Sequence, residues 1–434
     1  MKTALLLAAA LSALNAAAQA PRVFRTQFTT YDTREDALAA NHKNTLKYRS
    51  VEPRDIYGDG SAFVFEFETD ALWGDSNAYL HIENPGSAYT LFINGHLAAE
   101  SEDDLSPADF MISDLLLNGR NVAAIFPRQS RTPQIQNSGK KSELPRFSGS
   151  YIFGQRKLHI EDFAARILPD SAEAGAGRLY LDVVVANNFN YEEPVSIGYD
   201  ITSPSGKLID YAVREMTVAG HSLDTLRITA PIYNIPAYKW GVSSGEAPLY
   251  SLMLYIKRNG RPEEYIPFKT GYGITRFTAD GKLSRAGNEV NIISHRYAVK
   301  SDRKAVRNEL ATLKKQGINT IITEFPQPAW FYEECDRAGL FVFDRAAINA
   351  VEERDNRNQG GTPSNDPAMV EEYRNRINAM YFRMRNRSSA AGFVLGGETG
   401  NGYAMYKAYQ YLKSLEKERP VICDDARGEW NTDL

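Results

Sequence analysis

The side chains that could do acid–base chemistry in this chain follow short apolar runs in its last third. Glu398 comes after Leu395-Gly396-Gly397, and Asp344 comes after the apolar run 340–343. A carboxyl group flanked by glycines at the end of a strand is positioned by the backbone. Two such groups held together can act as general acid and nucleophile. An acid that caps a helix or lies in a solvated loop would show the same pattern. Other acids at predicted strand ends are Glu324, Asp424 and Asp425.

The elements that must position these acids alternate between strand and helix from residue 285 onward. The apolar runs predict strands at 290–294, 318–323, 340–343, 392–395 and 421–423. Helical spacing of apolar residues predicts helices at 302–316, 329–338, 367–385 and about 404–416. This β/α alternation is typical of a doubly wound sheet and of a (β/α) barrel, and the pattern alone does not decide between them.

The first two thirds of the chain have the pattern of antiparallel sheets. Short alternating runs such as 62–67 and 89–93 are separated by turn signals, and Asn94-Gly95 is the strongest hairpin signal in the chain. They predict a β-sandwich over residues 21–168, with an irregular lead-in to about residue 55. The small-residue stretch 170–177 is interpreted as a linker. The strands after it fill a second sandwich of immunoglobulin size over residues 175–278.

The amino terminus has the pattern of a secretory signal peptide. Lys2 provides the positive charge, Ala4 to Ala13 the short apolar run, and Ala16-Ala17-Ala18 a small-residue cleavage site. We therefore expect residues 1–18 to be removed and the protein to be periplasmic or secreted. The apolar run is too short for a membrane span, and no later segment is long enough.

The composition gives little support to several other classes of function. The net charge of −4 provides no electrostatic basis for binding nucleic acid. The two cysteines, Cys335 and Cys423, cannot form a disulfide framework, and the six histidines show no ligand spacing. We therefore expect neither a metal site nor a cofactor. The aromatic content of 11% suits half-buried strands and sugar-facing surfaces alike.

Motifs in all three segments carry a family resemblance. They are Thr90–Leu97, Asp109–Leu115, Phe147–Ile152, Pro248–Tyr250, Gly271–Gly273, Phe331–Asp344 and Asn386–Gly400. In this order they are similar to glycoside hydrolase family 2, the β-galactosidase and β-glucuronidase group. The resemblance implies a jelly-roll β-sandwich of the galactose-binding type over 21–168. It further implies an immunoglobulin-like sandwich over 175–278 and a (β/α)8 TIM-type barrel from 285 to 434.

The same resemblance implies a function for several residues. The expected ligand is a β-linked glycoside, and Glu398 falls on the acid/base of retaining hydrolysis, which needs two carboxylates about 5–5.5 Å apart. His295, Asp344 and Gly397 fall on or near positions that contact the sugar. Tyr403 is an aromatic side chain that could stack on a sugar ring.

The departures from the family pattern concern the chemistry itself. Gly397 stands where the family has the asparagine that hydrogen-bonds the sugar 2-hydroxyl, and Arg345 stands at a family glutamate. The family nucleophile lies on the seventh strand, whereas this sequence has about five, so we expect a partial barrel without a nucleophile. Three hypotheses remain: a weak or inactive glycosidase, a non-catalytic carbohydrate-binding or scaffold relative, and a truncated gene product. The open sheet edges predict a homo-oligomer or a partner that covers them.

Overall fold

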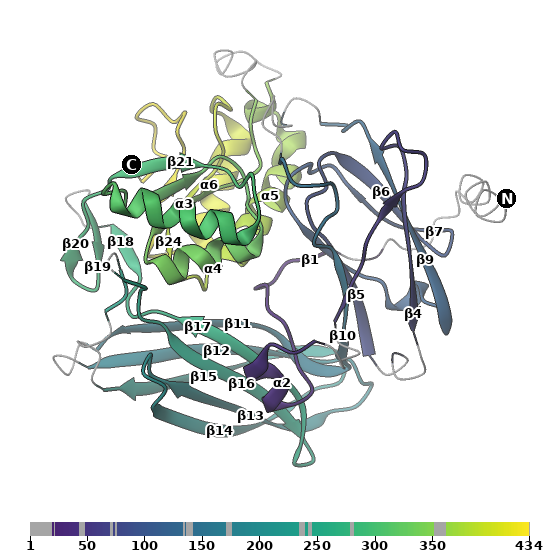
Figure 1. The fold of residues 1–434 in the computed structure, drawn as a ribbon, viewed down its shortest axis with the longest axis horizontal. Coiled ribbons are helices and arrows are strands. Elements are labelled where there is room, and N and C mark those ends of the chain that lie inside the picture. The colour runs from purple at the N-terminus through teal and green to yellow at the C-terminus, as the bar shows by residue number, and fades with distance from the viewer. Residues whose placement is uncertain are drawn as a thin grey trace.

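The computed structural model describes residues 20, 22–42, 48–69, 73, 76–132, 135, 142–170, 176–233, 239–241, 245–277, 282–350 and 362–433. The expected signal peptide, residues 1–18, lies outside the described residues. Three units surround a common centre in Figure 1: one of strands at the right, a second of strands at the bottom, and one of strands and helices at the upper left.

Two antiparallel sheets of five strands form the first unit. The first has the order β1-β8-β5-β10-β2, with β1 Arg22–Val23, β8 Ala108–Met111, β5 Ser76–Ile82, β10 Tyr151–Arg156 and β2 Arg49–Ser50. The second has the order β3-β4-β9-β6-β7, with β3 Arg54–Asp55, β4 Phe63–Thr69, β9 Gly119–Arg128, β6 Ala88–Ile93 and β7 His96–Ser101. Asn94 (φ 51°) and Gly95 (φ 83°) join β6 to β7, as the hairpin signal predicts.

The second unit contains a sheet of three strands and a sheet of four strands, all antiparallel. The three-stranded sheet is β11 Leu158–Pro169, β12 Gly177–Asn187 and β15 Ser222–Ile232. The four-stranded sheet has the order β14 Leu208–Val218, β13 Glu193–Thr202, β16 Tyr250–Arg258 and β17 Arg261–Thr270. Because β11 pairs with β12 over its whole length, the strands on either side of the predicted linker belong to one sheet. Residues 171–175 of that linker lie outside the described residues. The limits of the domains stay a prediction.

The lead-in before residue 55 reaches all three units. Its helix α2 (Arg34–Ala39) packs on β17 (Figure 1), and Tyr31 forms a β-bridge with Tyr265. The Thr26 hydroxyl donates to the Phe163 carbonyl in β11 at 3.1 Å. It also accepts from Asn386, in the third unit, at 3.0 Å. A small sheet of β18 Thr275–Phe277, β19 Leu283–Arg285 and β20 Asn288–Glu289 leads into that unit.

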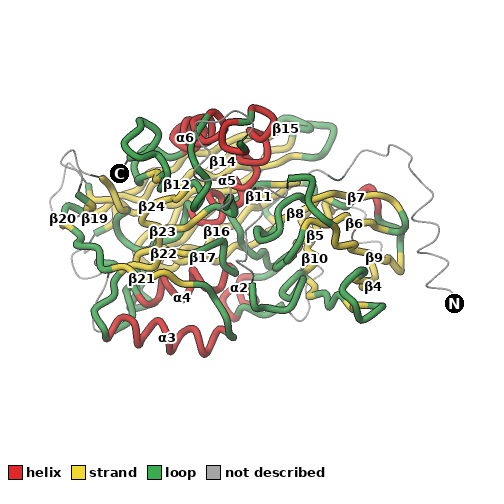
Figure 2. The backbone as a smooth tube through the Cα atoms, turned by 90° about the horizontal axis from the view of Figure 1, so that it is seen from above, coloured by secondary structure: helices red, strands yellow, loops and turns green. Residues whose placement is uncertain are grey.

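Parallel strands alternate with helices in the third unit. The strands are β21 Ser294–Tyr297, β22 Thr320–Thr323, β23 Phe341–Arg345, β24 Ala390–Val394 and β25 Val421–Ile422. The helices are α3 Arg303–Lys315, α4 Ala329–Ala338, α5 Val370–Met384 and α6 Tyr403–Leu415, with short 3-10 turns η6 Pro363–Asn365 and η7 Pro367–Met369 before α5. In Figure 2, β21 to β24 run between α3 and α4 at the bottom and α5 and α6 at the top.

The strand order of this sheet is sequential, β21-β22-β23-β24-β25. A sequential order is that of a β/α barrel, whereas a doubly wound sheet reverses its order at a switch point. Local signals place the helices well: Asp302 caps α3 by accepting from Lys304 N and Ala305 N, and Gly339 ends α4 with φ 76°.

The two faces of the sheet pack differently. Ile321, Val342 and Phe393 pack against the helices in the largest apolar core of the unit. Phe343 and Val394 belong to a separate cluster on the other face, which is called the inner face below. No helix in the described part of the chain is both long and apolar enough to cross a membrane.

Candidate active site

The carboxyl ends of four neighbouring strands bring together the polar side chains of the candidate site. Glu324 follows β22, Arg345 ends β23, Glu398 follows β24 and Asp424 follows β25. Since the strands are parallel neighbours, these residues lie along one edge of the sheet. Active sites of β/α barrels are built at this edge.

The backbone around Glu398 is held in a strained shape by several hydrogen bonds. Glu398 has a left-handed φ of 55°, which is unfavourable for a residue with a side chain. The N–H of Gly397 donates to the Ile348 carbonyl at 2.9 Å, and the Glu398 carbonyl accepts from Ala350 N at 3.2 Å. Asp425 Oδ2 accepts from the N–H groups of the next two residues at 2.6 and 2.9 Å. Strained residues supported in this way cluster at functional sites.

Arg345 is the cation of the site and is almost completely buried. Its side chain is 4% exposed, and its Nη2 lies 2.9 Å from Asp424 Oδ2. Burial lowers the pKa of Arg345, and nearby Arg296 lowers it further, while Asp424, Glu398 and Glu324 act in the opposite direction. The guanidinium therefore contacts one carboxylate, Asp424, and lies within electrostatic range of two more, one of which is the candidate acid/base.

Gly397 leaves room for this guanidinium. A Cβ atom built on Gly397 would overlap Arg345 Nη1 and lie 2.9 Å from Cζ, so any side chain here would displace the arginine. The absent side chain at Gly397 and the arginine at 345 are thus two parts of one arrangement directly before Glu398.

Asp344, a predicted sugar-contacting residue, points away from this edge. It is fully buried, and its Oδ1 accepts hydrogen bonds from Thr323 and Tyr332, both at 2.7 Å. Burial raises the pKa of Asp344. Successive residues of a strand face opposite sides of the sheet. Asp344 therefore lies on the helix side, and Arg345 lies on the inner face, as Phe343 does.

The same alternation separates His295 from its neighbour Arg296. His295 pairs with Ile321, which packs against the helices, so the structure places His295 on the helix side of the edge strand β21. Arg296 pairs with Ile322, which packs in the inner cluster, and it is close enough to influence Arg345. Tyr403, at the start of α6, is 42% exposed. Its backbone N–H donates to Asn365 Oδ1.

Comparison with known proteins identifies relatives of this chain. A family model described as "Glycosyl hydrolases family 2, TIM barrel domain" matches residues 295–433. A β-galactosidase of Streptococcus thermophilus is 22% identical over 376 residues, which is 83% of this chain and 35% of that protein. A β-galactosidase of Priestia megaterium is 24% identical over 383 residues, 84% of this chain and 36% of that protein. The chain is a relative of glycoside hydrolase family 2.

Solved structures share the fold of this family 2 relative. A glycosyl hydrolase family 2 member from Bacteroides cellulosilyticus DSM 14838 has a TM-score of 0.68 at 14% identity, covering 93% of this chain and 57% of that one. The exo-chitosanase CsxA of Amycolatopsis orientalis has a TM-score of 0.68 at 16% identity, covering 84% of this chain and 44% of that one. The chain spans about a third of the length of the curated relatives it matches.

The first unit supplies one wall of the candidate site, which no local sequence signal indicates. Ile135 is completely buried in the core of the barrel unit, and the fully buried Arg376 of α5 donates to the carbonyls of Ile135 and Ala347. Leu105 of the first unit packs with Phe325 and Ala347 in the loops after β22 and β23. The edge that holds Glu398 is therefore formed by two units.

The described residues contain no group of three or more His, Cys, Asp or Glu side chains that could hold a metal ion. Two acids near the candidate site bond to protein groups: Asp424 pairs with Arg345, and Asp425 accepts backbone N–H groups.

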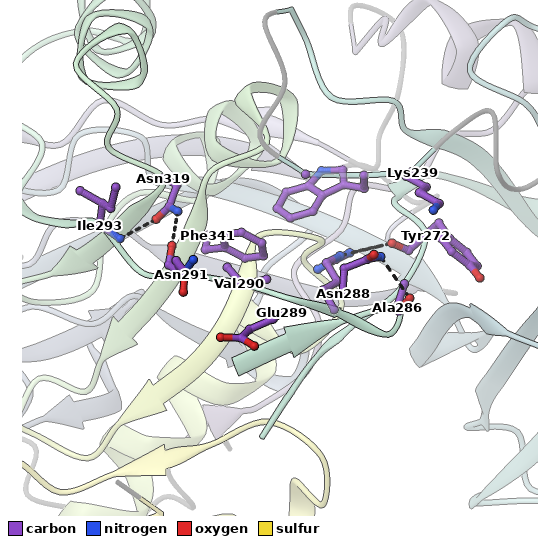
Figure 3. A pocket seen from close by; sticks show the side chains of 13 residues that line it. Lys239, Tyr272, Ala286, Asn288, Glu289, Val290, Asn291, Ile293, Asn319 and Phe341 are labelled. Atoms are coloured by element: carbon purple, nitrogen blue, oxygen red, sulfur yellow. Dashed lines mark hydrogen bonds between the residues drawn. The ribbon is translucent and has the colours of Figure 1, made fainter. Parts of the chain in front are cut away.

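A cavity of about 380 Å³ lies at the opposite end of the sheet (Figure 3). Its lining includes Asn319 and Phe341, at the amino ends of β22 and β23, together with Val290 and Ile293. The sequence predicts a strand over 290–294, but β21 begins only at Ser294. The apolar run before it lines this cavity instead, and Ile293 remains 53% exposed. Since its walls belong to the amino ends of the strands, this cavity is separate from the site of Glu398.

Proposed function

We propose that the carboxyl edge of the barrel sheet binds a β-linked glycoside, of the β-galactoside type, with Glu398 as the acid/base. The observation that carries this proposal is the strained, hydrogen-bonded turn that fixes Glu398 at the carboxyl end of β24. The similarity of the chain to family 2 proteins supports a β-glycoside as the substrate class. β-Galactosidases and a β-glucuronidase of Bacteroides uniformis are among the proteins that the chain resembles.

We also propose that hydrolysis by this site is weak or absent. Arg345 stands where the family has a glutamate, and its guanidinium fills the space beside Gly397, directly before Glu398. Gly397 provides no side chain to hydrogen-bond the sugar. These features favour carbohydrate binding without turnover as the second candidate function.

One pair of measurements distinguishes the two functions. The purified protein is tested for hydrolysis of aryl β-galactosides and aryl β-glucuronides and, by calorimetry, for binding of the corresponding thioglycosides. For the enzyme, Glu398→Gln abolishes turnover and keeps binding, because the amide retains the shape of the acid. The matched control Glu371→Gln, on the exposed face of α5, changes neither.

Each result has a definite meaning. Binding without turnover in the wild-type protein supports the carbohydrate-binding function. Turnover that Glu398→Gln leaves unchanged removes Glu398 from the mechanism. Neither turnover nor binding contradicts both functions.

The finer architecture and the location of the protein are also proposals. We infer that the first unit is a jelly-roll sandwich, because it contains two antiparallel five-stranded sheets. The second unit, with sheets of three and four strands, fits an immunoglobulin-like sandwich, and the third fits a partial (β/α)8 barrel. The composition of residues 1–18 supports export to the periplasm or the medium. Sequencing the amino terminus of the protein from its native host tests cleavage after Ala18.

A further inference from the structure

Arg383 of α5 is a buried cation without hydrogen bonds. It is 4% exposed, and its Nε, Nη1 and Nη2 atoms all lack a partner among the described residues. Oδ2 of Asp344 lies 3.9 Å from Nη2, too far for a hydrogen bond, and is itself without a partner. Burying an ionised guanidinium in this way is costly, so such a group usually indicates a bound water or ion.

A small cavity of about 40 Å³ adjoins Arg383. Its walls come from α5, from the lead-in and from β5 and β8 of the first unit, and they include Arg25, His81, Asp109 and Asn378. Since a water needs roughly 10–15 Å³ of such space, the cavity has room for about three waters or one small ion.

Three cationic side chains line the cavity. Arg25 and Arg383 are both buried, and Arg25 pairs with Glu161 at 3.5 Å. Burial alone would lower the pKa of His81, but Asp109 at 2.6 Å and Glu83 at 3.1 Å outweigh it and raise the pKa to about 9. His81 is therefore charged at neutral pH. Asp109 is the one carboxylate in the described lining, and it already pairs with His81.

Carboxylates outside the lining do not supply the missing hydrogen bonds. Asp344, Glu83 and Asp103 all lie within electrostatic range of Arg383, but none of them is hydrogen-bonded to it. Asp344 is fully buried, and Glu83 is bonded to His81. Asp103 accepts from backbone N–H groups of its own loop. Their charges and the Tyr332 ring, 5.3 Å from Arg383 Cζ, offset part of the cost of burying the guanidinium, while its N–H groups have no hydrogen-bond partner among the described residues.

A second donor stands in the same wall. Asn378 is 8% exposed, and its Oδ1 accepts the Tyr411 hydroxyl at 2.6 Å. This bond orients the carboxamide and leaves the amide nitrogen to donate. We propose that the cavity binds one small inorganic anion of halide size, through the N–H groups of Arg383 and the amide of Asn378. The bound anion joins α5 to the first sandwich. This inference is independent of the proposed glycoside function.

Bromide is the direct probe of this site. Crystals of the full chain are soaked in sodium bromide or in sodium gluconate, and anomalous scattering at the bromine edge locates the ion. We expect a bromide peak within hydrogen-bond distance of Arg383 in the first case only. Bromide peaks confined to the protein surface, or water alone in the cavity in both cases, would overturn the proposal.

Unfolding in solution provides the second readout. A ligand that binds only the folded state raises the unfolding midpoint along a saturating curve. We expect such a rise with sodium chloride, compared with sodium gluconate at equal ionic strength. It should be lost in Arg383→Met and in Asn378→Asp, which keeps the acceptor for Tyr411 but places a negative charge beside the anion. Arg120→Met, in β9 of the first unit, where the arginine side chain is 66% exposed, should keep the full rise.

The Asn378→Asp variant protects the test against a folding failure of Arg383→Met. Equal midpoints of the wild-type protein in chloride and gluconate contradict the proposal. So does a chloride shift in Asn378→Asp as large as that of the wild-type protein.

Discussion

Replacing Gly397 by alanine is the sharpest test of the arrangement beside Glu398. The new Cβ atom would overlap Arg345 Nη1, and its three closest neighbours are all atoms of that side chain. The backbone of Gly397 does not have a positive φ, so alanine itself is tolerated there. The arginine must move, and in moving it loses its ion pair with Asp424.

The size of the effect follows from the loss of the ion pair and from the insertion of a methyl group. A hydrogen bond to a charged group contributes about 1.5–3 kcal/mol. The lower end applies here because Asp424 is 39% exposed and therefore screened by solvent. Inserting a methyl group into a filled site costs about 1–3 kcal/mol. We therefore expect Gly397→Ala to lower the free energy of unfolding by about 3 kcal/mol.

Urea unfolding followed by circular dichroism measures this effect, and a double-mutant cycle assigns it to the arginine. In an Arg345→Ala background the obstructing group is absent, so Gly397→Ala should cost almost nothing. The control Gly245→Ala adds a methyl group to open space and should leave stability unchanged. If Gly397→Ala costs the same in both backgrounds, or costs nothing in the wild-type protein, the guanidinium does not occupy this space.

Two further predictions concern a charged cluster inside the first unit and a set of hydrogen bonds between units. The pKa of His81 is raised to about 9 from 6.5 by Asp109 and Glu83. Its charged form therefore stabilises the fold fully below about pH 6.5, and this stabilisation, about 3 kcal/mol, is lost as the pH rises through about 9. Urea midpoints measured across this range should fall in the wild-type protein and stay level in His81→Gln. Parallel curves for the two proteins would show that His81 does not cause the pH dependence. Asn386→Ala removes three buried hydrogen bonds between units and should cost about 2–4 kcal/mol and speed proteolysis, whereas Asn308→Ala, on the exposed face of α3, should not.

Much of the third unit could be predicted from local sequence because its signals are local. The helix over 302–316 is confirmed as Arg303–Lys315, and the short helix over 329–338 has the predicted limits. Asp302 before one helix and Gly339 after the other mark these limits within a few residues of sequence. The strand expected at 290–294 is displaced because its apolar residues line the cavity at the amino end of the sheet, a role that depends on residues far away in sequence.

The candidate site was predictable only in part. Glu398 follows a buried strand, and the sequence locates it at that strand's carboxyl end. The choice between Asp344 and Arg345 depends on which residue of a strand faces the helices, and a shift of one position reverses the answer. The register shift between Val342 and Phe343 leaves Ala391 of β24 without a partner, so the face on which a residue of β24 lies depends on its pairing with β23.

The sequence by itself determined the β/α alternation, the hairpin at Asn94-Gly95 and the acid at the end of β24, because each depends on residues close together in the chain. Only the tertiary structure decided that Arg345 lies over Gly397, that Ile135 of the first unit is buried in the barrel core, and that Arg383 borders a charged cavity. These contacts join residues from distant segments. Their strength comes from burial and charge, which exist only after the units have packed together.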